Sequence, residues 1–246
     1  MTIMWAWGRF KNNYGVIDVG WGPVIIGQGI VYAIFGENNP VKLFVVGVGI
    51  VWALRLAVYI FFTRILPNHP EDKRYVEFRK DYGNKVHSKF YTNVFLLQGG
   101  LALFVSIPFL IVSLKAFEEF SILVWIGCAI SLLGILFEAI ADLQLKNFVH
   151  DPSNKGKVCN IGLWKYSRHP NYFFEWIVWV GVGIATLAVP EIGFLGLITP
   201  IFMYLLLVYV SGVPLAEKQS LKSKGKLFEE YQKTTNAFFP WFPKKG

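Results

Sequence analysis

Long apolar stretches dominate the pattern of hydrophobic and polar positions along this chain of 246 residues. A helix needs about 20 mainly apolar residues to cross the roughly 30 Å hydrocarbon core of a bilayer. Glycine and proline inside such a stretch do not argue against a helix, because transmembrane helices tolerate both. The predicted spans are Val16–Phe35, Val41–Leu66, Val94–Leu114, Ile122–Leu145, Tyr172–Val189 and Ile192–Val213.

The same pattern gives no sign of alternating strands. We therefore predict an all-α fold: a single membrane-embedded domain, residues 1–246, built as a polytopic bundle of six transmembrane helices, or seven if a further helix forms at the N-terminus. Met1–Phe10 is too short to span, and its Trp5 and Trp7 are typical of an interfacial anchor.

Composition agrees with a membrane protein. Hydrophobic residues make up 54% of the chain and charged residues 16%, against about a quarter charged in soluble globular proteins. Cys128 and Cys159 are too few for a disulfide framework or a four-ligand zinc site, so no metal is predicted. Although the net charge is +8, no soluble basic domain carries it, and nucleic acid is not an expected partner.

Basic residues are concentrated in the connections on one side of the predicted spans. Of the 24 Lys and Arg residues, all but Lys42, Arg55 and Lys115 fall on one side of the predicted spans. By the positive-inside rule this side is cytoplasmic and holds both termini. The longer connections, Pro67–Asn93 and Lys146–Asn171, lie there too, so we expect the chemistry to face the cytoplasm. Attraction to anionic lipid would also explain the asymmetry without any function.

Several polar side chains fall inside the predicted spans, where each ionisable group costs about 2.5–3.5 kcal/mol. Glu138, Asp142 and Lys146 follow one another at four-residue spacing, which places them on one helix face. This column is suited to ribose hydroxyls or to cationic groups of the next loop. An internal ladder of salt bridges is an equally good interpretation.

A second polar group lies in the first two predicted spans, and it is suited to a cavity that opens at the cytoplasm. Its members are Asp18, Trp21, Gln28, Arg55 and Tyr59. Arg55 needs an acceptor, because a buried guanidinium cannot stay unpaired. Tyr59 alone is also consistent with an ordinary buried aromatic that finds one hydrogen bond.

The densest cluster of chemically capable residues is the run Gly162–Glu175. Pro170 favours a helix start, because proline at the first helical position loses no hydrogen bond. Beside this start stand three basic residues: Lys165, Arg168 and His169. A helix N-terminus flanked by cations predicts an anion site, which suits a phosphate-bearing cofactor.

Asn171 and Glu175 lie one turn apart at the start of the same predicted helix. They add hydrogen-bonding groups beside the predicted anion site. A basic collar that only touches lipid headgroups would explain Lys165 and Arg168, but it would leave Asn171 and Glu175 without a role.

The run Gly162–Glu175 resembles the Trp-Arg-Tyr-Ser-Arg-His-Pro-Asn-Tyr-x-x-Glu signature of the DUF1295 branch of the steroid 5α-reductase superfamily, membrane reductases that act on conjugated double bonds. Its Arg-His-Pro core is shared with isoprenylcysteine and phospholipid methyltransferases. Further similarity lies at Asp18–Trp21, Arg55, Tyr59, Glu71–Tyr75, Gln98, Asp142–Gln144, Ser211–Leu215, Phe228–Tyr231 and Phe239–Pro240.

The resemblance implies an NADPH-dependent reduction of a hydrophobic enone, such as a 3-oxo-Δ4 steroid. It implies substrate-side helices in residues 1–92 and a cofactor-binding portion in residues 93–246. Together with the cations around the helix start, the predicted cofactor contacts are Asp142, Lys146, Lys165, Arg168, His169, Asn171, Tyr172, Glu175, Glu217 and Tyr231.

Hydride transfer to the β-carbon of an enone leaves enolate charge on the carbonyl oxygen, so the site needs a hydrogen-bond donor there. The resemblance implies Tyr59 as that donor and Gln28 as its companion, with Asp18, Trp21 and Arg55 around the substrate. Membrane lipid and a hydrophobic small molecule are the expected partners. Two alternatives are an S-adenosylmethionine-dependent membrane methyltransferase and a transporter or binding protein without chemistry.

Overall fold

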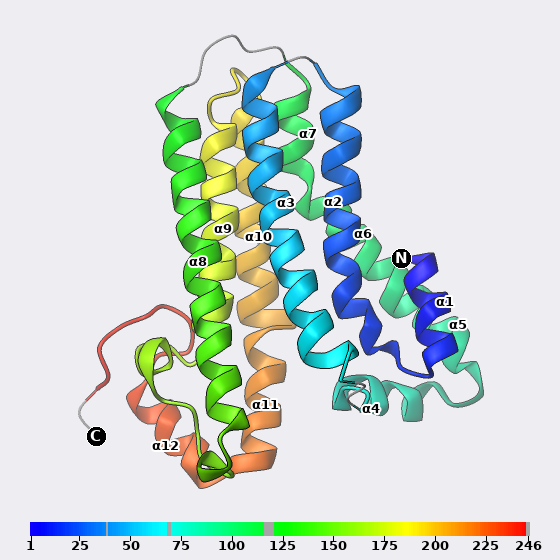
Figure 1. Cartoon of the computed structure of the whole chain (residues 1–246), viewed down its shortest axis with the longest axis vertical. Coiled ribbons are helices and arrows are strands. Elements are labelled where there is room, and N and C mark those ends of the chain that lie inside the picture. Colours follow the sequence, from blue (N-terminus) through cyan, green and yellow to red (C-terminus); the bar gives the residue numbers. More distant parts are fainter. Residues whose placement is uncertain (38, 68–69, 116–120, 245–246) are drawn as a thin grey trace. The chain divides into compact units, whose positions relative to one another are not determined.

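The computed structural model describes residues 1–37, 39–67, 70–115 and 121–244, and regular secondary structure in these ranges is helical throughout (Figure 1). The all-α prediction is thus confirmed. The chain divides into two compact units, Met1–Phe120 (unit 1) and Ser121–Gly246 (unit 2). The predicted functional division at residue 92 stays a prediction.

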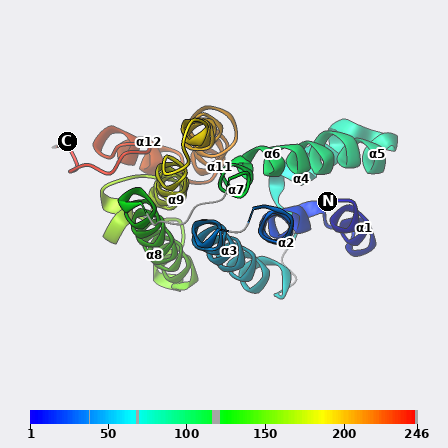
Figure 2. The same ribbon diagram turned by 90° about the horizontal axis from the view of Figure 1, so that it is seen from above.

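Unit 1 is built on the antiparallel pair α2 and α3, which lie side by side in both ribbon views (Figure 2). Asn39 starts α3 by accepting a hydrogen bond from the Lys42 N–H at 2.6 Å, and Pro40 follows at the first helical position. The helices are α1 (Thr2–Lys11), α2 (Ile17–Phe35), α3 (Pro40–Ile60), α4 (Lys73–Tyr82), α5 (Val86–Phe90), α6 (Leu97–Val105) and α7 (Ile107–Ser113).

Unit 2 is built on the close pairing of α8 with α9. Small residues allow this approach: a side chain at Gly127 or Gly181 would collide with the backbone of the opposite helix. The Ser131 hydroxyl donates a hydrogen bond to the Val178 carbonyl at 2.8 Å across the same seam. The helices are α8 (Ile122–His150), α9 (Pro170–Thr186), α10 (Ile198–Leu205), α11 (Val213–Lys224) and α12 (Lys226–Thr234).

The predicted number of six spans is not confirmed. In the described part of the chain, four helical segments are long and apolar enough to cross a membrane, or five if a segment bent by 40° before α7 counts as one span. The predicted span Tyr172–Val189 falls on α9, whose 17 residues give a length of about 26 Å, short of the hydrocarbon core.

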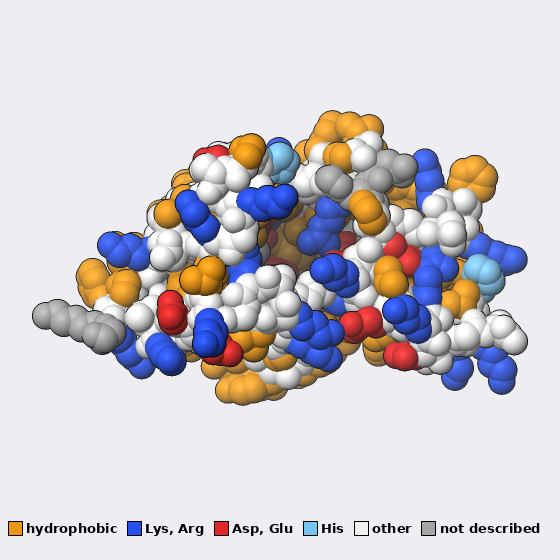
Figure 3. Space-filling view, turned by 90° about the horizontal axis from the view of Figure 1, so that it is seen from below, with side chains coloured by type: hydrophobic (Ala, Val, Ile, Leu, Met, Phe, Trp, Pro, Cys, Tyr) orange, Lys and Arg blue, Asp and Glu red, His pale blue; other side chains and the backbone are white. Residues whose placement is uncertain are grey.

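These apolar helices make the chain a multi-pass membrane protein. Lys and Arg side chains are spread over the end of each unit that carries α4 or α12 (Figure 3). Four spans would place the two termini on the same side of the membrane, whereas five would place them on opposite sides. The cytoplasmic placement of both termini therefore stays a prediction.

Candidate functional site

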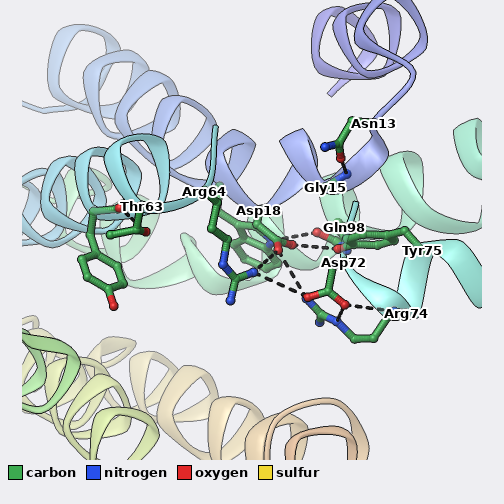
Figure 4. A network of polar contacts seen from close by, with 11 residues as sticks. Asn13, Gly15, Asp18, Thr63, Arg64, Asp72, Arg74, Tyr75 and Gln98 are labelled. Carbon is green, nitrogen blue, oxygen red and sulfur yellow. Dashed lines mark hydrogen bonds and ion pairs between the residues drawn. The ribbon is translucent and has the colours of Figure 1, made fainter. Parts of the chain in front are cut away.

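Two polar clusters contain most of the predicted site residues, one in each unit. In unit 1 the centre is Asp18, near the start of α2 (Figure 4). The Tyr75 hydroxyl donates to Asp18 Oδ1 at 2.7 Å, while Arg64 and Arg74 donate to Oδ2 at 3.2 and 3.3 Å. This predicted substrate residue therefore joins α2 to the end of the α3 segment and to α4.

Asp72 supports the same cluster. Its carboxylate caps α4 by accepting from the Arg74 N–H at 2.9 Å, and it also receives the Arg74 Nε at 3.0 Å. Arg64 Nη1 lies 3.7 Å from Asp72. Burial alone would raise the pKa of Asp72, but the hydrogen bonds from Arg74 and the charges of Arg74 and Arg64 outweigh it and hold this pKa below its ordinary value.

A cavity of about 300 Å³ opens beside these charges, and it offers both carboxylate and guanidinium groups to whatever enters it. It is lined by Asn13, Gly15, Asp18, Arg64, Ile65, Pro70 and Asp72.

The other predicted residues of unit 1 lie on α2 and α3. Trp21 donates its indole N–H to Gln98 Oε1 at 2.8 Å, and the Arg55 guanidinium stands 5.5 Å from the centre of the Tyr59 ring. Gln28 Oε1 is buried and has no hydrogen-bond partner among the described residues. The predicted roles of Tyr59 and Gln28 stay predictions.

In unit 2 the loop Gly162–His169, called the Arg168 loop below, is attached to the end of α8. Gln144 Oε1 accepts a hydrogen bond from the Leu163 N–H at 2.9 Å, and Trp164 donates its indole N–H to the Ala141 carbonyl at 2.9 Å. Gly162 has a φ of +54°, and a side chain there would collide with the Gln144 amide. The loop therefore requires glycine at this position for both reasons.

Arg168 is the most heavily bonded side chain of this loop. Its Nε donates to Glu217 Oε1 at 2.7 Å, and its Nη1 donates to the carbonyls of Gln232 and Thr235. His169 Nε2 lies 3.3 Å from the same Glu217 oxygen, and Gln232 Nε2 donates to the other oxygen at 2.7 Å. Arg168 thus joins the loop to α11 and α12.

The C-terminal segment 236–242 runs back along the loop. The backbone N–H of Arg168 donates to the Asn236 carbonyl, and that of Trp241 donates to the Tyr166 carbonyl, both at 2.9 Å. The Ser167 hydroxyl donates to the Phe238 carbonyl at 2.8 Å. Tyr231, on α12, donates its hydroxyl to loop carbonyls, and burial foremost raises its pKa.

Asp142 and Asn171 meet where α8 faces the first turn of α9. Asn171 Nδ2 donates to Asp142 Oδ1 at 3.2 Å, and Asp142 is buried. A carboxylate only accepts hydrogen bonds, so this contact fixes the orientation of the Asn171 amide. The other amide atom, Oδ1, is buried and has no hydrogen-bond partner among the described residues.

Comparison with known proteins adds one finding to this geometry. The DUF1295 family model, described as "Protein of unknown function (DUF1295)", matches residues 4–235. The chain belongs to the DUF1295 family. No curated protein and no solved structure matched this DUF1295 protein.

The DUF1295 chain brings most of the predicted cofactor residues of unit 2 into one region. Arg168 and His169 both contact Glu217, and the Tyr172 ring stacks on His169 with 5.5 Å between ring centres. Glu175 is half-buried on α9, whereas Lys146 and Lys165 are exposed. Their assignment to a cofactor stays a prediction.

Several residues of these clusters had no predicted role. Arg64, Asp72, Arg74 and Tyr75 surround Asp18, and Gln144, Ser167 and Gln232 hold the Arg168 loop. The family-like runs Glu71–Tyr75 and Asp142–Gln144 contained a signal for part of this set. The hydrogen bonds between the loop and the C-terminal segment have no sequence signal, because their acceptors are backbone carbonyls, which every residue has.

Proposed function

We propose that this DUF1295 protein is a membrane reductase that uses NADPH to reduce the conjugated carbon–carbon double bond of a hydrophobic enone, such as a 3-oxo-Δ4 steroid. The similarity of Gly162–Glu175 to the signature of the steroid 5α-reductase superfamily supports this assignment. Bound NADPH would supply the hydride for the β-carbon, and a proton from solvent would complete the product at the α-carbon. The chain's own residues would hold the dinucleotide, position the enone and donate a hydrogen bond to its carbonyl oxygen.

The observation that carries the proposal is the Asn171 amide. Its Nδ2 is engaged by Asp142, and its buried Oδ1 has no donor among the described residues. An unsatisfied buried acceptor costs about 1–3 kcal/mol. A ligand that donates an N–H or O–H group would remove this cost, and the carboxamide and ribose hydroxyls of a nicotinamide dinucleotide are such donors.

The charges around Asn171 fit the phosphate groups of the same molecule. The α9 N-terminus contributes a positive helix dipole, and the exposed Lys165 lies in the loop before it. Arg168 is already bonded to Glu217 and to two carbonyls. We therefore assign Arg168 mainly to the construction of the loop and Lys165, with Lys146, to phosphate attraction.

On the substrate side, the proposal keeps Tyr59 as the hydrogen-bond donor to the enone carbonyl and Gln28 as its companion. Arg55 stacks over the Tyr59 ring and restricts its orientation. The buried Gln28 Oε1 offers an acceptor to a substrate or to a second hydroxyl.

A direct experiment uses the purified protein in lipid nanodiscs with NADPH and a panel of 4-en-3-one steroids and other hydrophobic enones. We expect a product that has gained two hydrogens, detected by mass spectrometry. Asn171→Ala should weaken NADPH binding at least about tenfold, the effect of losing about 1.4 kcal/mol. Asn147→Ala, an exposed change on α8, is the control and should leave binding unchanged.

The alternatives give different results in the same experiment. Stabilisation by S-adenosylmethionine without any effect of NADPH would overturn the reductase assignment in favour of a methyltransferase. Binding of enones with no product and no NADPH binding would indicate a transporter or binding protein.

The donor role of Tyr59 has its own test. Tyr59→Phe should lower kcat while the NADPH Kd stays at the wild-type value, because only the hydroxyl is removed. Tyr209→Phe is a control at an exposed tyrosine of unit 2. Full turnover of Tyr59→Phe would refute the donor assignment without refuting the reductase function.

A further inference from the structure

The C-terminal segment that covers the Arg168 loop has a second, outward-facing side made of large aromatic residues. Phe239, Trp241 and Phe242 are 49%, 69% and 74% exposed. Seen from below, unit 2 shows hydrophobic side chains among its Lys and Arg side chains (Figure 3). Large aromatic side chains are enriched where a protein meets the headgroup region of a bilayer.

This aromatic side continues the surface of a candidate membrane span. The Phe239 ring lies 6.0 Å from the ring of Tyr204 and 5.8 Å from that of Trp176. Tyr204 belongs to α10, within the apolar segment Gly193–Lys224. The same helix exposes Ile201 and Leu205, which are suited to lipid. The aromatic side therefore extends a surface that already faces the membrane.

Basic residues flank the aromatic side. Lys244 is exposed two residues beyond Phe242, and exposed Lys165 precedes Tyr166, whose ring contacts Phe242 at 5.9 Å. Lysine beside aromatic residues favours the anionic headgroup region over the hydrocarbon core. The aromatic side is continuous with the span and is flanked by lysines. Both features favour contact with lipid rather than with another protein.

We propose that Phe239, Trp241 and Phe242 insert into the headgroup region of the membrane and thereby hold the C-terminal segment on the Arg168 loop. The loop side of the segment supplies the mechanical link, through the hydrogen bonds of Arg168 N–H with Asn236 and of Trp241 N–H with Tyr166. The order of the loop then depends on the lipid around the protein.

A fluorescent probe tests the insertion. Cys128 and Cys159 are replaced by alanine, Trp241→Cys is labelled with an environment-sensitive fluorophore, and the protein is placed in nanodiscs that contain anionic lipid. We expect blue-shifted emission that headgroup-nitroxide lipids quench. The matched control, Lys155→Cys, lies in an exposed loop of the same unit and should report water. Equal exposure to water at positions 241 and 155 would overturn the proposal. If the emission shifts or is quenched only after another protein is added, the aromatic side binds a protein and the proposal is also overturned.

Hydrogen–deuterium exchange tests the link to the loop. Phe242→Asp should speed amide exchange in peptides covering residues 162–169 about tenfold in nanodiscs, which corresponds to about 1.4 kcal/mol of lost protection. Ser223→Asp, an exposed change on α11, is the control and should leave exchange unchanged. Unchanged loop exchange in Phe242→Asp would refute the link. Neither measurement requires cofactor or turnover, so a negative result leaves the proposed reductase function untouched.

Discussion

The two polar clusters use arginine in opposite ways. Arg168 of unit 2 has a side chain only 10% exposed and bonds to Glu217 and to two backbone carbonyls. Arg64 of unit 1 is 53% exposed and lies beside a cavity, 3.2 Å from Asp18 and 3.7 Å from Asp72. The first arginine is part of the architecture, whereas the second pairs with titratable groups in contact with solvent.

This difference predicts how each cluster responds to its surroundings. Backbone carbonyls do not titrate, and largely buried pairs are screened little by salt, so in a given lipid the Arg168 loop should keep its structure over a wide range of salt concentration. The ion pairs around Asp18 and Asp72 depend on charge and are open to screening. Substitutions in the two clusters should therefore differ in size and in their dependence on pH.

The largest effect is expected for Arg168→Met. This change takes the guanidinium away from Glu217 in a largely buried pair, where only His169 and Gln232 remain beside the carboxylate, and it also removes the donor from the carbonyls of Gln232 and Thr235. We expect a loss of about 3–5 kcal/mol in the free energy of unfolding. A lower apparent Tm in nanodiscs, followed by intrinsic fluorescence, is the measurement.

Two matched variants sharpen this comparison. Lys165→Met removes an exposed neighbouring charge, and Arg64→Met removes the half-exposed arginine of unit 1. Each should cost less than about 1 kcal/mol, as exposed ion pairs do. If Arg64→Met lowers the Tm as much as Arg168→Met does, the proposed contrast between the clusters is wrong.

The sequence predicts local features of these clusters well. Pro170 marks the start of α9, and the start of that helix places Asn171 where it meets Asp142 of α8. These features follow from short-range patterns: a proline at a helix start and polar residues inside apolar stretches. The all-helical fold follows from the same kind of pattern.

Contacts between residues far apart in the chain could not be predicted from the sequence. The return of residues 236–241 along the loop depends on backbone carbonyls, which every residue has, so no residue type marks it. The sequence predicts Asp18 in the substrate site, and this role stays a prediction; its bonds to Arg64, Arg74 and Tyr75 have no sequence signal, because only the folded chain brings residues about 50 positions apart together. The number of spans depends on a bend before α7 and on the length of α9, which hydropathy alone does not define.

An intermediate effect is expected for Gly162→Ala. This residue combines a φ of +54° with close contact to the Gln144 amide, so alanine there meets both backbone strain and a collision. We expect a loss of about 1–2 kcal/mol and faster amide exchange in the loop.

Gly156→Ala is the matched control for Gly162→Ala. Its φ is +83°, but the space that a side chain would enter is open, so only the backbone cost applies. The Tm should fall less than for Gly162→Ala. Equal losses would show that the fastening of the loop by Gln144 contributes nothing measurable to stability.

The smallest effect is expected for Asp72→Asn. Asparagine keeps the cap of α4 but removes the charge that pairs with Arg74 and Arg64. Since the ion pairs hold the pKa of Asp72 below its unfolded value of about 3.9, the charge stabilises the fold above that value and ceases to do so as the pH falls through the lower, folded pKa. At neutral pH the variant should lose less than about 1 kcal/mol. Its Tm should approach that of the wild type as the pH falls below about 3.9 and should coincide with it only below the folded pKa of Asp72; a difference that persists at that acid limit would place the effect in packing rather than in charge.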